Sequence, residues 1–273
     1  MRNSILAIFI TIIATTLFGK AVAHTPSYSF GIVPQQSASK LARLWGPILR
    51  EVGSQAGIEL RFATARDIPT FESRLANGEY DFSYMNPYHF TVFHESSGYQ
   101  ALAKARDKRI KGILVVRKDS NINSLADLDA KKLAFPAPAA FAATILTQSH
   151  LNASGINFES KYVSSHDSVY RAVAKGLYPA GGGVIRTFKN VAPEVREQLK
   201  IFWVSEGFTP HAIAAHPRIP PEVVNRLQLA LVSLETSEAG RELLQSIRLT
   251  GLEPAQNADW DDVRQLGLDR LSY

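Results

Sequence analysis

Short apolar segments with strand character alternate with amphipathic helical segments along almost the whole chain, and this alternation constrains the fold most. A strand is predicted at 28–33. A helix follows, whose apolar residues share one face: Leu41, Leu44, Trp45, Ile48, Leu49 and Val52. The strand–helix order then recurs toward the C-terminus with short connections. It predicts an α/β fold with helices covering mostly parallel sheets.

Several local predictions depend on proline, alanine or glycine. Pro47 is expected to kink or break the first helix, because proline removes a backbone donor. An alanine-rich helix is predicted over 139–151, and a strand over 161–164. The three glycines at 181–183 predict a tight turn.

The order of the strands also predicts two lobes. Strands at 113–116 and 201–205 bracket a middle unit, which we delimit as residues 114–206. Residues 24–113 together with 207–273 would then form the other lobe. Because the chain would cross between the lobes twice, the sequence predicts a hinge of two segments.

The N-terminus resembles an export signal. Arg2 precedes an apolar run over 5–18, and the small residues at 21–23 form a cleavage site. The rival interpretation is a membrane anchor, but the run is shorter than the ~20 residues that span a bilayer. We therefore expect residues 1–23 to be a cleaved signal peptide and the mature protein to be soluble and periplasmic.

Composition and motifs exclude several function classes. The formal charge of +5 falls to about +3 without Arg2 and Lys20, which is too mild to indicate nucleic-acid binding. The chain has no cysteine, which excludes disulfides, thiolate metal sites and a lipidated N-terminal cysteine. Phosphate-loop, dinucleotide-binding, nucleophile-elbow and zinc-protease motifs are missing. We therefore expect no cofactor, no metal and no catalytic residue. The glutamates at 72, 79 and 95 are interpreted as solvated.

Four strand-to-helix junctions are candidates for a ligand site, because helix N-termini there direct backbone N–H groups into a crevice. They lie at 34–39, 84–90, 136–141 and 164–167. Each also has a purely structural explanation. Ser37 and Ser165 could serve simply as helix caps, with no role in binding. Phe90 could belong to the hydrophobic core, and the alanines at 137, 139 and 140 could serve close packing.

Segments in a defined order resemble the phosphonate-binding, PhnD-like periplasmic proteins of ABC transporters. They are 31–37 with 44–47, then 78–88, then 124–128 leading into 132–136, and finally 166–169 with Val173 and Gly176. The resemblance implies a type II periplasmic binding fold, with two α/β lobes joined by two crossing segments. It also implies that helix N-termini in the cleft capture a phosphate, phosphite or phosphonate group.

The resemblance also implies the site residues by position. Ala139, Ala140 and Phe141 would act through backbone N–H groups. The full candidate set is Gln35, Ser37, Tyr84, Asn86, Tyr88, His89, Ala139, Ala140, Phe141, His166 and Asp167.

Two departures from the family pattern bear on the ligand. Transport members usually carry Ser and Thr hydroxyls where this chain has Ala139, Ala140 and Phe141, and an acidic residue where it has 178–181. Each missing charge-assisted hydrogen bond could be worth ~1.5–3 kcal/mol. Without the acid, an aminoalkylphosphonate is disfavoured. The aromatic side chains would suit a ligand with an apolar or cationic part.

These observations predict a monomeric solute-binding protein that closes around a small anionic ligand. The expected partner is an inner-membrane ABC permease, or else the sensor kinase of a two-component system. Two rival function classes are an enzyme on the same bilobal fold and a structural or adhesive exported protein.

Overall fold

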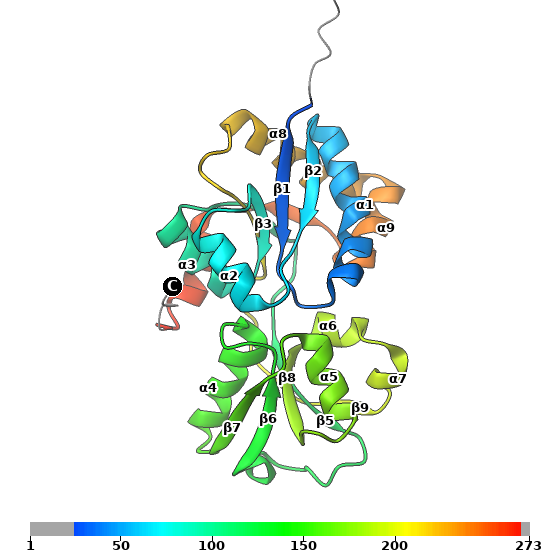
Figure 1. The fold of residues 1–273 in the computed structure, drawn as a ribbon, viewed down its shortest axis with the longest axis vertical. Helices are drawn as coiled ribbons and strands as arrows, with labels where there is room; N and C mark the ends of the chain where they lie inside the picture. Colours follow the sequence, from blue (N-terminus) through cyan, green and yellow to red (C-terminus); the bar gives the residue numbers. More distant parts are fainter. Residues whose placement is uncertain (1–24, 269–273) are drawn as a thin grey trace, which may run out of the picture.

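The structure, a computed structural model, describes residues 25–268, which form two lobes stacked along the long axis (Figure 1). Lobe 1 contains a six-stranded sheet in the order β11-β4-β10-β3-β1-β2. Its strands are β1 (Ser27–Ile32), β2 (Glu59–Ala63), β3 (Phe82–Met85), β4 (Gln100–Ala105), β10 (Ala212–Ala215) and β11 (Leu252–Pro254).

Lobe 2 contains a five-stranded sheet in the order β7-β6-β8-β5-β9. Its strands are β5 (Gly112–Arg117), β6 (Lys131–Phe135), β7 (Phe158–Tyr162), β8 (Ala180–Val184) and β9 (Leu199–Val204). The strand expected at 161–164 therefore lies earlier in the chain, at β7.

Both sheets are mixed, so the α/β class is confirmed but the expectation of mostly parallel sheets is wrong. β1 runs parallel to β2 and β3, and β6 runs parallel to β7 and β8. β10 is antiparallel to β3 and β4, and β5 is antiparallel to β8 and β9. β5 and β10 are the first strands after the chain crosses between lobes. Neither is reached through a helical crossover within its own sheet, so parallel pairing is not imposed on them.

Two crossing segments connect the lobes. The chain leaves lobe 1 after Ala105 and enters β5 at Gly112, and it returns between Val204 and Ala212. The segments are hydrogen-bonded to each other, since the Ile110 N–H donates to the Phe208 carbonyl at 2.8 Å and the reverse bond measures 3.0 Å. The link is thus a short two-stranded ribbon.

Helices cover the lobe 1 sheet: α1 (Ala38–Ala56), α2 (Ile68–Ala76), α3 (Pro87–Ser97), α8 (Pro221–Ser233), α9 (Glu238–Ser246) and α10 (Asp261–Arg264). α1 continues through Pro47, so of the predicted kink or break, the break is wrong. Proline removes one hydrogen bond, but Trp45, Ile48 and Leu49 bury the same stretch of helix in the core.

In lobe 2 the helices are a π-helical turn η2 (Phe141–Ile145), α4 (Leu146–Ala153), α5 (His166–Ala174), α6 (Ile185–Asn190) and α7 (Pro193–Arg196). The helix expected from 139 therefore begins two residues later. A 3₁₀ turn, Leu125–Leu128, is capped by Ser124, whose backbone N–H donates to the carboxylate of Asp127.

The three glycines at 181–183 lie in a buried strand, so the predicted turn is wrong. A Cβ atom on Gly182 would overlap the carbonyl oxygen of Ala143, and one on Gly183 would overlap the hydroxyl of Tyr170. The missing side chains let η2 and α5 approach β8 closely. These glycines therefore serve packing.

Among residues 25–268, no helix is both long and apolar enough to cross a membrane. The signal-peptide prediction for residues 1–23 lies outside the described residues.

Candidate functional site

The lobes contact each other at the carboxyl ends of their parallel strands. β1 and β3 lead into α1 and α3, and β6 and β8 lead into η2 and α6 (Figure 1). This edge of each sheet is where α/β folds place ligands. Polar side chains from both lobes meet here, and the structure is closed.

A chain of three polar side chains crosses the cleft. Arg186, at the start of α6, donates to Oε1 of Gln35 at 2.6 Å. The amide nitrogen of Gln35 lies 3.1 Å from Nε2 of His211 and donates to it. His211 lies on the returning crossing segment, just before β10, so the chain joins lobe 2, lobe 1 and the hinge.

His211 is neutral in this arrangement. Burial, then the nearby Arg186 charge, hold the pKa of His211 well below its usual value. A neutral ring with its proton on Nδ1 accepts from Gln35 through Nε2.

His166 is also neutral and fully buried at the first turn of α5. Burial first, and Arg186 second, lower the pKa of His166 to about 3. Its Nδ1 lies 3.1 Å from the hydroxyl of Thr187, and its backbone N–H donates to the Gln35 carbonyl at 3.2 Å. The N-terminus of α5 thus already meets lobe 1 in the closed form.

Asn86 connects a helix cap with the interlobe contact. Its Oδ1 accepts from the His89 N–H at 2.8 Å, capping α3, while its Nδ2 donates to the Ala139 carbonyl at 3.0 Å. The Ala140 N–H donates to the Ala137 carbonyl, so it is engaged within its own loop. Phe141 packs edge-on against Phe208 of the crossing segment, at 5.6 Å between ring centres.

Tyr84, at the end of β3, forms the aromatic wall of the site. Its ring stacks on His211 at 4.9 Å and contacts Trp45 at 4.6 Å, and the Arg186 guanidinium lies 5.6 Å from its centre. Burial raises the pKa of Tyr84, while Arg186 opposes that shift, so the hydroxyl is a protonated donor at neutral pH.

The remaining predicted residues lie around this centre. Asp167 forms an ion pair with Lys40 of α1 at 3.8 Å, and burial, against the opposing Lys40 charge, leaves its pKa raised. Ser37 is exposed at the start of α1, where its side chain makes no capping bond. Tyr88 is buried in α3.

His89 lies in the core of lobe 1, between the rings of Phe71 and Phe93, and its Nε2 is 2.8 Å from Glu72. The interpretation of Glu72 as solvated is therefore wrong: it is buried. Helical spacing brings it to the face of α2 that meets α3.

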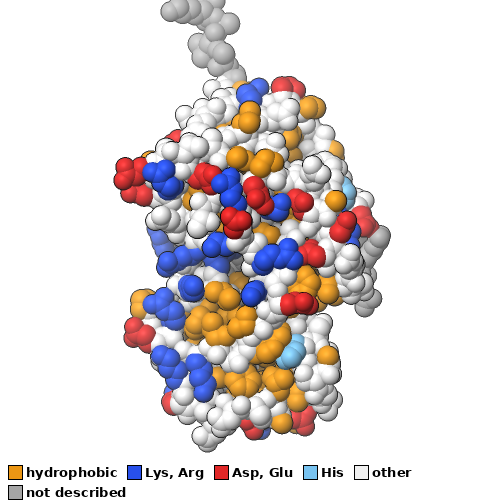
Figure 2. Space-filling view, turned by 180° about the vertical axis from the view of Figure 1, so that it is seen from behind, with side chains coloured by type: hydrophobic (Ala, Val, Ile, Leu, Met, Phe, Trp, Pro, Cys, Tyr) orange, Lys and Arg blue, Asp and Glu red, His pale blue; other side chains and the backbone are white. Residues whose placement is uncertain are grey.

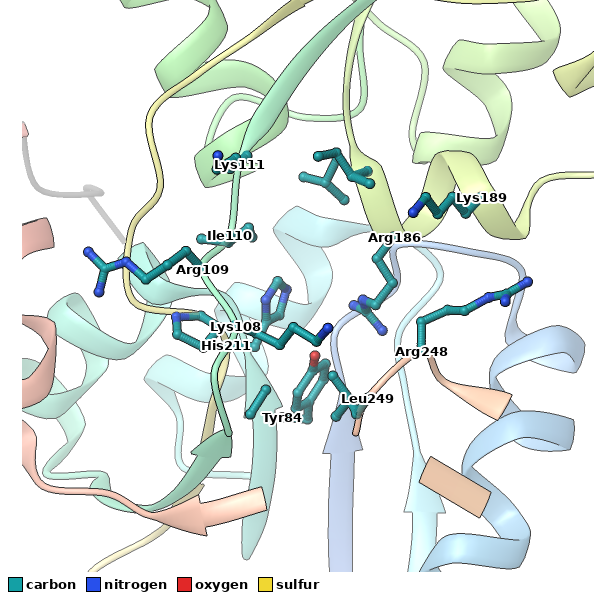
Figure 3. A pocket seen from close by; sticks show the side chains of 14 residues that line it. Tyr84, Lys108, Arg109, Ile110, Lys111, Arg186, Lys189, His211, Arg248 and Leu249 are labelled. Carbon is teal, nitrogen blue, oxygen red and sulfur yellow. The ribbon is translucent and has the colours of Figure 1, made fainter. Parts of the chain in front are cut away.

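An inner and an outer cavity lie in the cleft between the described lobes, and a further small one adjoins Gln35 and Arg186. The inner cavity is only about 10 Å³ and is lined by Gln35, Asn86, Ala140, Phe141, His166 and His211. The outer cavity is about 200 Å³ and opens at the waist of the molecule, where Lys and Arg side chains gather (Figure 2). Figure 3 shows Lys108 and Arg186 pointing from opposite sides toward the hydroxyl of Tyr84. Ile110, Val184 and His211 line both cavities.

The site offers positive charge and neutral donors for an anion. None of the described residues that line the inner and outer cavities is acidic. Within residues 25–268, no group of three His, Asp or Glu side chains could hold a metal ion.

Sequence reasoning does not identify Arg186 or His211. Because a turn is predicted at 181–183, no strand is assigned before Arg186 and the strand-to-helix junction there is not recognised. His211 and His216 are five residues apart, and this spacing argues only against a pair of metal ligands. A strand assignment for 180–184 would have indicated Arg186.

Comparisons with known proteins show the family of the chain. The sequence profile of the family described as "ABC transporter, phosphonate, periplasmic substrate-binding protein" matches residues 30–260. The phosphate-import protein PhnD of Mycolicibacterium smegmatis is 22% identical over 275 residues, covering 86% of this chain and 83% of that protein.

Two solved structures share the fold. A binding protein component of an ABC phosphonate transporter from Pseudomonas aeruginosa superposes with a TM-score of 0.82 at 17% identity, covering 89% of this chain and 86% of that one. PhnD1 from Prochlorococcus marinus, in complex with methylphosphonate, gives 0.81 at 16% identity, covering 88% and 97%. The fold is that of type II periplasmic binding proteins. The chain belongs to the family of periplasmic substrate-binding proteins of phosphonate ABC transporters.

Proposed function

We propose that this protein captures a phosphorus oxyanion between its lobes and delivers it to an ABC permease in the inner membrane. The observation that carries the proposal is the Arg186–Gln35–His211 chain, which sets one fixed cation and neutral donors at the closing edge of the cleft. A phosphonate, phosphite or phosphate would bind against Arg186 and the Tyr84 hydroxyl, because charge-assisted bonds of this kind are the strong ones.

The proposal also defines the parts of the molecule. Residues 24–113 with 207–273 act as one lobe and 114–206 as the other, and the two crossing segments bend between them. Residues 1–23 export the chain as a signal peptide, and the mature protein acts as a periplasmic monomer. The proposed contacts are Gln35, Tyr84, Asn86, His166, Arg186 and His211, with Asp167 and Ser37 at the rim.

In this proposal His89 acts through its neighbours. It is buried against Glu72 and donates its backbone N–H to Asn86, so it positions the cap of α3. Ala139, Ala140 and Phe141 shape the lobe 2 wall. The small side chains of the two alanines and the contact between the Phe141 and Phe208 rings set how closely the lobes approach.

A thermal-shift titration with phosphate, phosphite and methylphosphonate tests the proposal. A ligand at 100 times its dissociation constant should add about 2.7 kcal/mol of stability. Arg186→Met should weaken binding at least tenfold, whereas Arg61→Met, on an exposed position of β2, should not change it. If none of the three anions stabilises the protein, the proposed function is wrong.

A second measurement separates binding from catalysis. Phosphorus NMR after long incubation should recover the bound anion unchanged, as expected for a carrier. Growth of a deletion strain on that anion as its sole phosphorus source should fail, because uptake would require the protein.

A further inference from the structure

The outer cavity carries more positive charge than a single oxyanion neutralises. The described residues that line it include no acidic side chain and six cationic ones: Lys108, Arg109, Lys111, Arg186, Lys189 and Arg248. They come from the first crossing segment, from α6 and from the segment after α9. Three separate parts of the chain therefore contribute charge to one space.

Most of these charges are uncompensated. Within residues 25–268, Arg109 is the one member of this set that pairs with a carboxylate, Asp262, at 2.7 Å. Arg186 is held by the neutral amide of Gln35, and Arg248 donates to the neutral amide of Asn190 at 2.9 Å.

Lys108, Lys111 and Lys189 are exposed and have no carboxylate within 4.0 Å in the described part of the chain. Lys104, elsewhere in lobe 1, is by contrast compensated, because it forms ion pairs with both Glu253 and Asp259. Five like charges around one cavity repel one another unless an anion occupies it.

The cavity is also larger than one phosphonate group fills. Its volume is about 200 Å³, whereas the volume of the inner cavity is about 10 Å³, enough for about one water. An oxyanion bound at Arg186 and Tyr84 occupies the base of the outer cavity. Lys189 and Arg248 line the cavity beyond it, and the flexible side chain of Lys108, which points toward the Tyr84 hydroxyl in Figure 3, reaches into the same space from the crossing segment.

We propose that the ligand carries a second anionic group, held by Lys108, Lys189 and Arg248 in the outer cavity. The ligand class is a phosphonate or phosphate ester with a carboxylate or a second phosphoryl group. The inference rests on the proposed function, because it assigns the first anionic group to Arg186. It agrees with the described lining of the outer cavity, which includes no carboxylate that could bind a ligand amine.

Calorimetric titrations with methylphosphonate and phosphonoacetate test this at equal ionic strength and pH 8. These probes share the phosphonate and differ by a carboxylate. Phosphonoacetate should bind at least about tenfold more tightly, as expected for added charge-assisted hydrogen bonds. The double variant Lys108→Gln/Lys189→Gln should reduce this preference to about twofold.

The matched control is Lys118→Gln/Lys175→Gln, which removes the same charge from exposed positions of lobe 2 that line neither cavity. It should keep the tenfold preference. Equal binding of the two probes by the unaltered protein, or a preference that survives the Lys108/Lys189 change, overturns the inference while the proposed function stands. Binding of neither probe overturns the inference, and the titration with phosphate and phosphite then decides the proposed function separately. Binding of succinate as tight as that of phosphonoacetate overturns the inference, because the ligand would then need no phosphorus group.

Discussion

Arg186 organises the cleft through several neighbours at once. It fixes Gln35 by a hydrogen bond, lies against the Tyr84 ring, and contributes to the low pKa values of His166 and His211. Because both histidines stay neutral, they add no titrating positive charge next to Arg186. Anion binding through Arg186 should therefore vary little between pH 6 and pH 8, apart from titration of the ligand itself.

The buried histidines should make folding stability sensitive to acid. His166 has a pKa of about 3 in the folded protein, against about 6.5 when unfolded. Between those values the unfolded chain binds the extra proton, so stability is complete above about pH 6.5 and is lost as pH falls toward 3. The loss is at most about 1.4 kcal/mol per pH unit for each such histidine.

Urea unfolding at pH 7 and pH 5 measures this effect. The free energy of unfolding should be lower at pH 5, and His166→Asn should shrink the difference because Asn does not titrate. A difference equally large in His166→Asn would show that another group is responsible.

Part of the site could be predicted residue by residue. Gln35, Asn86 and His166 are predictable because they follow strands, and the structure brings these three to the face between the lobes. Their roles in ligand binding stay predictions. His89 shows the limit of such reasoning, since its neighbour Glu72 lies 17 residues away and only the packing of α2 on α3 brings them together.

At the scale of elements, β8 shows how packing determines local structure. Propensity favours a turn at three successive glycines, yet the chain forms a central strand there, between β6 and β5. The strand is stable because η2 and α5 occupy the space that side chains would fill. That requirement is tertiary, and a pattern of residues along the chain does not contain it.

Gly182→Ala should therefore be strongly destabilising. The new methyl group would overlap the Ala143 carbonyl, and because this neighbour is backbone it cannot move alone. We expect a loss of about 3 kcal/mol, at the upper end for overpacking, measured by urea unfolding. The control is Gly46→Ala in α1, where the nearest atom lies 3.6 Å away, and it should stabilise by about 0.5–1 kcal/mol. Equal effects of both changes would contradict the packing explanation.

Asn86 allows the cap of α3 to be separated from lobe closure. Asn86→Asp keeps an acceptor for the His89 N–H but places a carboxylate against the Ala139 carbonyl. Asn86→Ala removes both contacts, and loss of the cap should cost about 1 kcal/mol in unfolding experiments.

Small-angle scattering without ligand should give a larger radius of gyration for Asn86→Asp than for Asn86→Ala. Repulsion between the new carboxylate and the Ala139 carbonyl should open the lobes more than loss of the hydrogen bond does. A radius of gyration for Asn86→Asp that matches the unaltered protein would mean that this contact does not control closure.

At the scale of the whole molecule, the two-lobe division could be predicted from strand order, whereas the sheet topology could not. Two crossings follow from where the strands lie in the chain. The direction of β5 and β10 depends on how the chain enters each lobe, and strand periodicity is the same for parallel and antiparallel pairs. The closed arrangement is likewise a property of the assembled lobes, since each interlobe bond joins residues more than 50 positions apart.

Asn190 accepts two of these interlobe hydrogen bonds, so it should influence the balance between open and closed forms. Its side chain accepts from Arg248, and its backbone carbonyl accepts from Lys40. Asn190→Ala removes the first bond and keeps the second. A hydrogen bond to a charged group contributes about 1.5–3 kcal/mol when fully formed, and less at this exposed position.

The ligand-free Asn190→Ala protein should therefore scatter as a larger particle, and a saturating anion should restore the compact form. Its apparent affinity should fall severalfold, because part of the binding energy would go into closing the lobes. Asn152→Ala, at an exposed position of α4, is the matched control and should leave both quantities unchanged. If ligand-free Asn190→Ala has the same radius of gyration as the unaltered protein, the buried contacts of Gln35 and Asn86 hold the closed form, and the Arg248–Asn190 hydrogen bond does not.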